Sequence, residues 1–320
     1  MLVRSVAGLA GTNVQCTIVA MASASLAEEA ACTLAGQQLR AFSAIVGAFV
    51  ADAASTPTHW CYDSQKLAAD LAGSPAAFAS PPLNPFYRLP PGSSTSYGEQ
   101  LLIALRSLVE HGGRQDRTDI GRRTAEAMGT ATEYGPLNRT TQEFGTGKME
   151  LPLDGPWRQG SVLHFLERLQ EGGGYLDSGG EDDQAECFIK TLPLVAAGAG
   201  QPQLLELVED AIRITQDNDA AVAYGVTAAR LLSAVVLGNR CAAAARSMPA
   251  MLRERSRDNP QPDDRYVAKR LNDVITMAEG GEVEASYLEC VATYCRSYDM
   301  ATYRRHDGVE VKAGVFTPLN

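Results

Sequence analysis

Apolar residues recur at helical spacing along most of the chain. They follow the i, i+3, i+4 and i+7 pattern that places side chains on one face of a helix. The longer stripes run over residues 42–50, 101–109, 162–169, 204–212 and 267–278. Two shorter stripes cover residues 185–192 and 288–295, and Pro193 is expected to bend or end the first of them.

Residues 219–237 are apolar on nearly every face. A helix of this kind is buried on all sides, so we expect it near the centre of the core, with Gly238 capping its end. Strand alternation is confined to Val309–Val315, and no fixed repeat of a helical solenoid is present. The pattern therefore predicts an all-α protein, with about eight to ten helices in a single compact domain over residues 28–298.

Three segments fall outside this pattern. Residues 73–97 are rich in proline and are expected to cross the surface between two helices, while residues 171–180 form a glycine-rich link. Residues 299–320 lose the helical period and are predicted to be an irregular, poorly packed tail. Residues 1–27 contain one arginine and no acid, and form either a removable leader or a disordered tail. The protein is accordingly expected in the cytoplasm, or in a mitochondrion or plastid if residues 1–27 are a transit peptide.

Charge and composition narrow the classes of partner. The 320 residues carry 28 Lys and Arg against 38 Asp and Glu, which gives a net charge of -10. A surface this acidic argues against nucleic acid or an anionic membrane as the main partner. No run of about 20 apolar residues lacks polar interruption, so no membrane-spanning helix is expected. The seven cysteines lack a C-x-x-C pair and are predicted to be reduced thiols.

Familiar catalytic signatures are absent from the sequence. It contains no G-x-S-x-G, no H-E-x-x-H and no phosphate-binding G-x-x-x-x-G-K-[ST]. His111 and His164 fall at or within helices and are interpreted as structural. The pairs Asp182-Asp183 and Asp217-x-Asp219 stand where helices begin, where acids are favoured by the helix dipole, so capping explains them as well as ligand binding does.

The most informative segment covers residues 47–63. A hydrophobic helix runs into Asp52, then into small residues, Pro57, His59 and Trp60. A carboxylate at the end of an apolar stripe either makes a local hydrogen bond that stops the helix or belongs to a site. His59 and Trp60, which follow a proline turn, either line a pocket for a ribose or a base or form a packed corner.

This segment resembles the N-terminal signature of the ADP-ribosylglycohydrolases, and it is closer still to the J-crystallin branch. The motifs that carry the resemblance are Ala51-Asp52-Ala53, Pro57-Thr58-His59-Trp60, Tyr62-Asp63 and Tyr97-Gly98-Glu99-Gln100. A third block, from Thr215 to Asp219 before the long apolar helix, is similar to the Thr-His-Asn helix start of the family. The likeness runs from about residue 40 to about residue 295.

The resemblance implies an all-α fold and, in active members, hydrolysis of ADP-ribosyl bonds assisted by two Mg²⁺ ions. This sequence departs from that pattern at three places. His59 replaces the expected catalytic glutamate, Tyr97-Gly98-Glu99-Gln100 replaces Thr-Asp-Asp-Thr, and the late Asp-x-Asp-Thr motif has no match. Mg²⁺ prefers several oxygen ligands and a neutral imidazole is a poor substitute, so weak or absent Mg²⁺ binding is expected.

The predicted site therefore contains Asp52, His59 and Glu99, with Asp52 and Glu99 as the candidate metal ligands. We expect the two carboxylates to face one another across a cleft, with His59 on its wall. Glu99 has an alternative role, because Ser96-x-x-Glu99 matches a capping box in which Glu99 returns to the N–H of Ser96.

Two function classes follow from the resemblance. The first is a hydrolase of ADP-ribosyl or related N- or O-glycosidic bonds, and the second is a catalytically silent structural or ligand-binding protein on the same fold. An ADP-ribosyl or other small-molecule ligand is the expected partner in either case. An unrelated helical scaffold remains the third interpretation.

Overall fold

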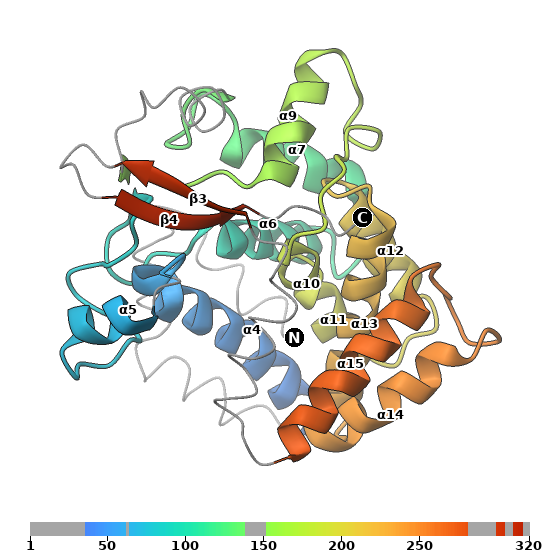
Figure 1. Ribbon diagram of the computed structural model, residues 1–320. Coiled ribbons are helices and arrows are strands. Elements are labelled where there is room, and N and C mark those ends of the chain that lie inside the picture. The colour runs from blue at the N-terminus through green and yellow to red at the C-terminus, as the bar shows by residue number, and fades with distance from the viewer. Residues whose placement is uncertain (1–35, 62–63, 138–151, 281–298, 305–309, 316–320) are drawn as a thin grey trace.

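A computed structural model describes residues 36–61, 64–137, 152–280, 299–304 and 310–315. Within these ranges the chain is helical, as the apolar stripes predict (Figure 1). The helices are α4 (Gly36–Ser55), α5 (Ser64–Leu71), α6 (Ser96–Glu110), α7 (Arg117–Met128), α9 (Gly160–Gln170), α10 (Glu186–Ile189), α11 (Leu192–Gly198), α12 (Leu204–Arg213), α13 (Asp219–Val236), α14 (Cys241–Arg253) and α15 (Asp264–Glu279). A 3₁₀ turn, η1 (Thr56–Thr58), continues α4. The all-α prediction is confirmed.

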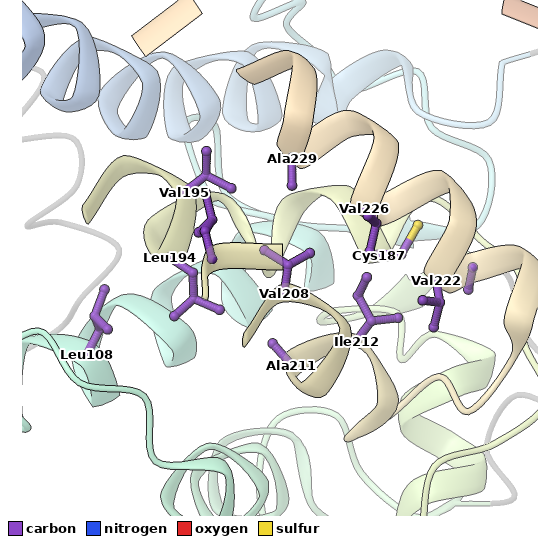
Figure 2. Packing of buried hydrophobic residues seen from close by; sticks show 12 residues of the cluster. Leu108, Cys187, Leu194, Val195, Val208, Ala211, Ile212, Val222, Val226 and Ala229 are labelled. Atoms are coloured by element: carbon purple, nitrogen blue, oxygen red, sulfur yellow. The ribbon is translucent and has the colours of Figure 1, made fainter. Parts of the chain in front are cut away.

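Helix α13 forms the centre of the fold, as its composition predicts. It packs against α4, α10, α11, α12, α14 and α15. Its residues Val222, Val226 and Ala229 face Val208 and Ile212 of α12 in the largest core cluster (Figure 2). The side chain of Asn218 caps the first turn by accepting a hydrogen bond from Ala221 N at 2.9 Å. Gly238 follows the helix with φ of 109°, a conformation that favours glycine.

Burial differs from the sequence pattern in two helices. The buried face of α4 carries Ala41, Phe49 and Ala53, whereas Val50 is 39% exposed. The stripe predicted over residues 185–192 is divided into α10 and α11, and Pro193 lies in the first turn of α11 instead of ending a helix. A proline is tolerated there because the first turn has no intrahelical acceptor for its N–H.

Three helices were not predicted from the sequence. Helix α7 is strongly charged, and its buried side consists of Ile120, Thr124 and Met128 at intervals of four residues. The sequence does not reveal so narrow a stripe, because only a few side chains on one face of this short helix pack into the core. Helices α5 and α14 also lie outside the predicted stripes, while the stripe over 288–295 lies outside the described residues.

The proline-rich segment 73–97 is more than a surface crossing. It contains the short strand β1 (Tyr87–Arg88), which pairs in parallel with β2 (Leu153–Asp154). Phe86, Tyr87 and Leu89 are buried and pack with Leu153, against Trp60 and Trp157. The expectation of a surface loop is therefore wrong for this part, because its aromatic residues form a small core of their own.

The C-terminal segment also differs from the prediction. Strands β3 (Asp299–Arg304) and β4 (Glu310–Val315) form an antiparallel pair in which Asp299 lies opposite Val315 and Arg304 lies opposite Glu310. The predicted irregular tail is thus corrected to a hairpin over these residues. The alternation noted from Val309 to Val315 was the sequence signal, and the ladder supplies the backbone hydrogen bonds that a lone strand would lack.

Two helical segments, Gly36–Thr58 and Asp219–Val236, are long and apolar enough to cross a membrane when judged by length and composition alone. For α13 the central position in the core accounts for this composition. That the protein has no membrane partner stays a prediction.

Candidate functional site

Asp52 is held at the N-terminus of α6. Its Oδ2 accepts the backbone N–H of Thr95 at 2.7 Å, and its Oδ1 accepts the Thr95 hydroxyl at 2.6 Å. The backbone N–H of Gly98 also stabilises the carboxylate. Asp52 thus joins the last turn of α4 to the first turn of α6, across 43 residues of sequence. The carboxylate lies where the free N–H groups and the dipole of α6 favour a negative charge.

Gly98 is the residue that lets Asp52 approach α6. A Cβ atom at position 98 would lie 2.5 Å from Asp52 Oδ2 and 2.6 Å from Ser94 Cβ. Both distances are shorter than van der Waals contact, so a side chain at position 98 would push the carboxylate away. The replacement of a family aspartate by Gly98 and the binding of Asp52 to the α6 N-terminus are therefore parts of one arrangement.

The predicted capping box at Ser96 and Glu99 is wrong in its register. The N-cap of α6 is Thr95, whose hydroxyl oxygen accepts the N–H of Tyr97 at 3.1 Å. The prediction had Glu99 accept the N–H of Ser96, whereas the N–H of the actual N-cap residue, Thr95, donates to Asp52. The carboxylate that satisfies this helix start comes from another helix, which a local motif does not reveal.

Glu99 is partly buried beside charged and aromatic neighbours. Burial raises the pKa of Glu99, the nearby Arg106 lowers it, and Glu133 raises it. Glu99 and Asp52 both contribute to a raised pKa of Tyr134, which places both acids near this ring. Their position on opposite sides of a cleft stays a prediction.

His59 follows η1 and is surrounded by aromatic rings. Its Nδ1 lies 2.6 Å from the Tyr87 hydroxyl. Its ring centroid lies 4.7 Å from that of Trp60 and 5.9 Å from that of Tyr97. Burial lowers the pKa of His59 to about 4, so the imidazole is neutral at physiological pH. His59 and Tyr97 lie next to each other, and Tyr97 directly precedes the Gly98 that contacts Asp52.

Trp60 has an unusual backbone conformation. Its φ is 62°, in the left-handed region that bulky residues rarely adopt. Its indole packs edge-on against Phe86 and Trp157, at centroid distances of 5.1 and 5.0 Å. This packing secures the corner after Pro57, and of the two interpretations of Trp60 it supports the packed one.

Residues 157–159 connect the aromatic cluster to the core, a role the sequence did not reveal. Arg158 is buried and donates to the carbonyl groups of Met128, Gly129, Gly135 and Pro136, with its guanidinium 5.6 Å from the centre of the Tyr134 ring. Gln159 accepts a hydrogen bond from Gln100 of α6. The only sequence signal would have been an arginine between two apolar stripes.

A second polar cluster lies deeper, between α9, α10 and α12. Glu186 is fully buried and accepts the Ser161 hydroxyl at 2.5 Å. Burial raises the pKa of Glu186 to about 7 and lowers the pKa of Lys190 to about 8. Lys190 Nζ donates to Ile212 O at 3.1 Å and to Thr215 Oγ1 at 2.7 Å, at the C-terminal end of α12. These groups connect helix ends inside the protein.

The predicted acid pairs are placed differently from one another. Asp217 and Asp219 both form ion pairs with Arg213 and are more than half exposed, whereas the residue that caps α13 is Asn218. Asp182 precedes α10, and its Oδ1 accepts the N–H of Gln184 at 2.9 Å. His164 is exposed on α9, and His111 Nδ1 lies 2.8 Å from Ser107 O.

The hydrogen bonds of Asp52 and His59 compete with the ligand roles that a two-magnesium site would require of these residues. Both oxygens of Asp52 already accept hydrogen bonds from α6, and His59 Nδ1 is occupied by Tyr87. A cation beside Asp52 would also meet the positive end of the α6 dipole. Two small cavities, one beside Tyr87 and one beside Lys190, each have room for about one water molecule.

Comparisons with known proteins agree with this arrangement of helices. The sequence model described as ADP-ribosylglycohydrolase matches residues 33–305. Crystallin J1A of Tripedalia cystophora is 34% identical over 230 residues, which is 71% of this chain and 65% of the crystallin. Crystallin J1B of the same organism is 35% identical over 204 residues, which is 63% of this chain and 59% of that crystallin. No solved structure matches the chain.

Proposed function

The chain belongs to the ADP-ribosylglycohydrolase family. Because the carboxylate of Asp52 accepts hydrogen bonds at the start of α6, we propose that the protein is a catalytically silent member with a structural or ligand-binding function. The observation that carries the proposal is the orientation of Asp52. Its carboxylate satisfies the N-terminus of α6 and so stabilises the fold. The likeness to two crystallins supports a structural role, in which the folded protein functions without catalysis.

The electrostatics of the site support the same proposal. Two-metal hydrolysis needs several converging oxygen ligands that remain charged beside the ions. Asp52 and Glu99 both have raised pKa values because burial disfavours their charged forms. His59 stands where the family pattern has a carboxylate and is neutral. The neutral imidazole in place of a carboxylate reduces the negative charge available to hold Mg²⁺.

Hydrolysis of an ADP-ribosyl bond is the second candidate function. The feature that favours it is Glu99, since a partly buried carboxyl group with a raised pKa keeps its proton to a higher pH and is suited to act as a general acid. In this function Glu99 would protonate the leaving group of an ADP-ribosyl substrate.

Activity and metal binding distinguish the two functions. The full-length protein would be incubated with ADP-ribosylated arginine and ADP-ribosylated serine peptides, with and without Mg²⁺, and free ADP-ribose measured. Calorimetric titration with Mg²⁺ would be run in parallel. The proposal predicts release no faster than in buffer and weak or no saturable binding of Mg²⁺.

Variants on α6 make the test specific. Glu99→Gln removes the candidate acid, whereas Glu110→Gln changes a glutamate on the same helix that is 59% exposed and paired with Arg123. Turnover that Glu99→Gln abolishes and Glu110→Gln preserves, with unchanged melting temperatures, would overturn the silent function and establish a hydrolase.

A further inference from the structure

One of the two small cavities lies where α6 and α7 meet the ends of α10 and α12. It has room for about one water molecule, and every residue that lines it is 9% exposed or less. Five of the lining residues are apolar. The polar ones are Gln100 of α6, Thr124 of α7, Lys190 at the end of α10, and Thr215 after α12. A molecule enclosed here must therefore find its hydrogen bonds among these four side chains.

Gln100 contributes an acceptor that no described residue uses. Its side-chain Nε2 donates to the side chain of Gln159, which is not part of the cavity wall. Its Oε1 is buried and has no hydrogen-bond partner among the described residues. Because Nε2 is directed toward Gln159, Oε1 is the polar atom of Gln100 that remains for the cavity. A buried carbonyl oxygen without a partner is costly, so this atom favours a donor inside the cavity.

Lys190 contributes the matching donor. Its Nζ donates to Ile212 O at 3.1 Å and to Thr215 Oγ1 at 2.7 Å. An ammonium group has three N–H bonds, so one is left for the cavity that Lys190 lines. Burial lowers the pKa of Lys190 to about 8, against the nearby acids Glu186 and Asp182, which raise it. The group is therefore mainly an ammonium at neutral pH.

Thr124 contributes a third partner. Its hydroxyl donates to Ile120 O at 2.8 Å, so the Thr124 oxygen keeps its capacity to accept. A water molecule in the cavity would accept from Lys190 Nζ and donate to Gln100 Oε1 and Thr124 Oγ1. Three hydrogen bonds are the usual number for a water molecule buried in a protein.

We propose that one internal water molecule occupies this cavity and joins the ammonium of Lys190 to the side chain of Gln100. The water connects the C-terminal end of α12, which Lys190 binds, to the N-terminal part of α6, which binds Asp52. Gln100 is the last residue of the motif at positions 97–100. The proposal gives it an internal role in the fold, and it goes beyond the silent function because it does not depend on whether the protein hydrolyses any bond.

A crystal structure of the wild-type full chain tests the site directly. We expect one peak of solvent density about 2.7 to 3.2 Å from both Lys190 Nζ and Gln100 Oε1. A cavity without such density, or a direct hydrogen bond between Lys190 Nζ and Gln100 Oε1, would overturn the proposal.

A double-mutant cycle tests the connection in solution. Gln100→Leu and Lys190→Met each break the bridge, so the second substitution costs less when the first is present. In urea unfolding, the midpoint of the double variant should fall by about two-thirds of the summed single losses or less. Gln261→Leu with Lys190→Met is the control cycle, because the buried Gln261 bonds to Glu209 and Asn259 and does not line the cavity. Losses that add equally well in both cycles would contradict the bridge.

A second cycle leaves Lys190 intact and decides the matter if Lys190→Met does not fold. Thr124→Val nearly preserves the side-chain volume and removes the acceptor for the water. It should lower the midpoint less in Gln100→Leu than in the wild type, and equal losses in the two backgrounds would count against the water. Release of ADP-ribose would overturn the silent function and leave this inference in place, since the cavity lies outside the Asp52 and His59 cluster.

Discussion

The substitution Asp52→Ala tests whether this carboxylate holds α6. It removes the acceptor of the Thr95 N–H at 2.7 Å and of the Thr95 hydroxyl at 2.6 Å. Hydrogen bonds to a charged group contribute about 1.5 to 3 kcal/mol each. The attraction to the α6 dipole adds about 0.3 to 1 kcal/mol. Burial works against these gains, since the pKa of Asp52 is raised mainly by loss of water. We therefore expect a net loss of about 2 to 4 kcal/mol, less than the gross sum of these terms.

Urea unfolding followed by far-ultraviolet circular dichroism measures this loss. The midpoint should fall while the slope stays constant, because the surface exposed on unfolding is unchanged. The melting temperature should fall by about 5 to 15 °C. Asp219→Ala is the matched control, because Asp219 is also an acid in the first turn of a helix but is 59% exposed and paired with Arg213. Its loss should be about 1 kcal/mol or less.

A loss for Asp52→Ala no larger than that for Asp219→Ala would refute this reasoning. In that case the carboxylate would not stabilise the start of α6, and it would be available for a ligand or a metal. Asp52→Asn should fall between wild type and Asp52→Ala, because the amide keeps one acceptor oxygen but presents an N–H group where the other carboxylate oxygen accepts a hydrogen bond.

Two further predictions concern stability. Gly98→Ala should destabilise the protein by more than about 1 kcal/mol in the same urea assay, because its Cβ would lie 2.5 Å from Asp52 Oδ2. The control Gly47→Ala, in open space on α4, should stabilise the protein by about 0.5 to 1 kcal/mol. Equal effects of the two substitutions would contradict the close approach at position 98. Glu186 binds its proton more tightly in the folded than in the unfolded protein, so the free energy of unfolding should fall as the pH rises from about 4.5 to about 7, and Glu186→Gln should flatten this dependence. Exposed Glu110→Gln is the control, and a pH profile that Glu186→Gln leaves unchanged would show that Glu186 is charged in the fold.

The helical fold could be predicted because its period is local. Helix α13 is apolar on nearly all sides, and its central position follows from that composition. Helix α7 was missed because its buried stripe of Ile120, Thr124 and Met128 is narrow. Phe86 and Tyr87 were assigned to a surface loop because their partners, Trp60 and Trp157, are distant in sequence.

The candidate site was predicted in its residues but not in their roles. The motif at residues 51–63 identified Asp52 and His59, and the motif at 97–100 identified the helix start that Asp52 binds. The partners Thr95 and Tyr87 were not predicted, because hydrogen bonds between segments 28 to 43 residues apart leave no local pattern. The absence of a side chain at Gly98 was counted as the loss of a ligand, while in the fold it makes room for Asp52.

The bond between Asp52 and Thr95 affects how motifs in this family should be interpreted. A domain of this kind is stable by only about 5 to 15 kcal/mol, so a side chain that contributes several of these is kept by selection for folding alone. An aspartate with this role would be retained even in a member that had lost hydrolysis. An aspartate at position 52 therefore indicates the fold. Position 59 is more informative about chemistry, because glycine at position 98 makes room for Asp52.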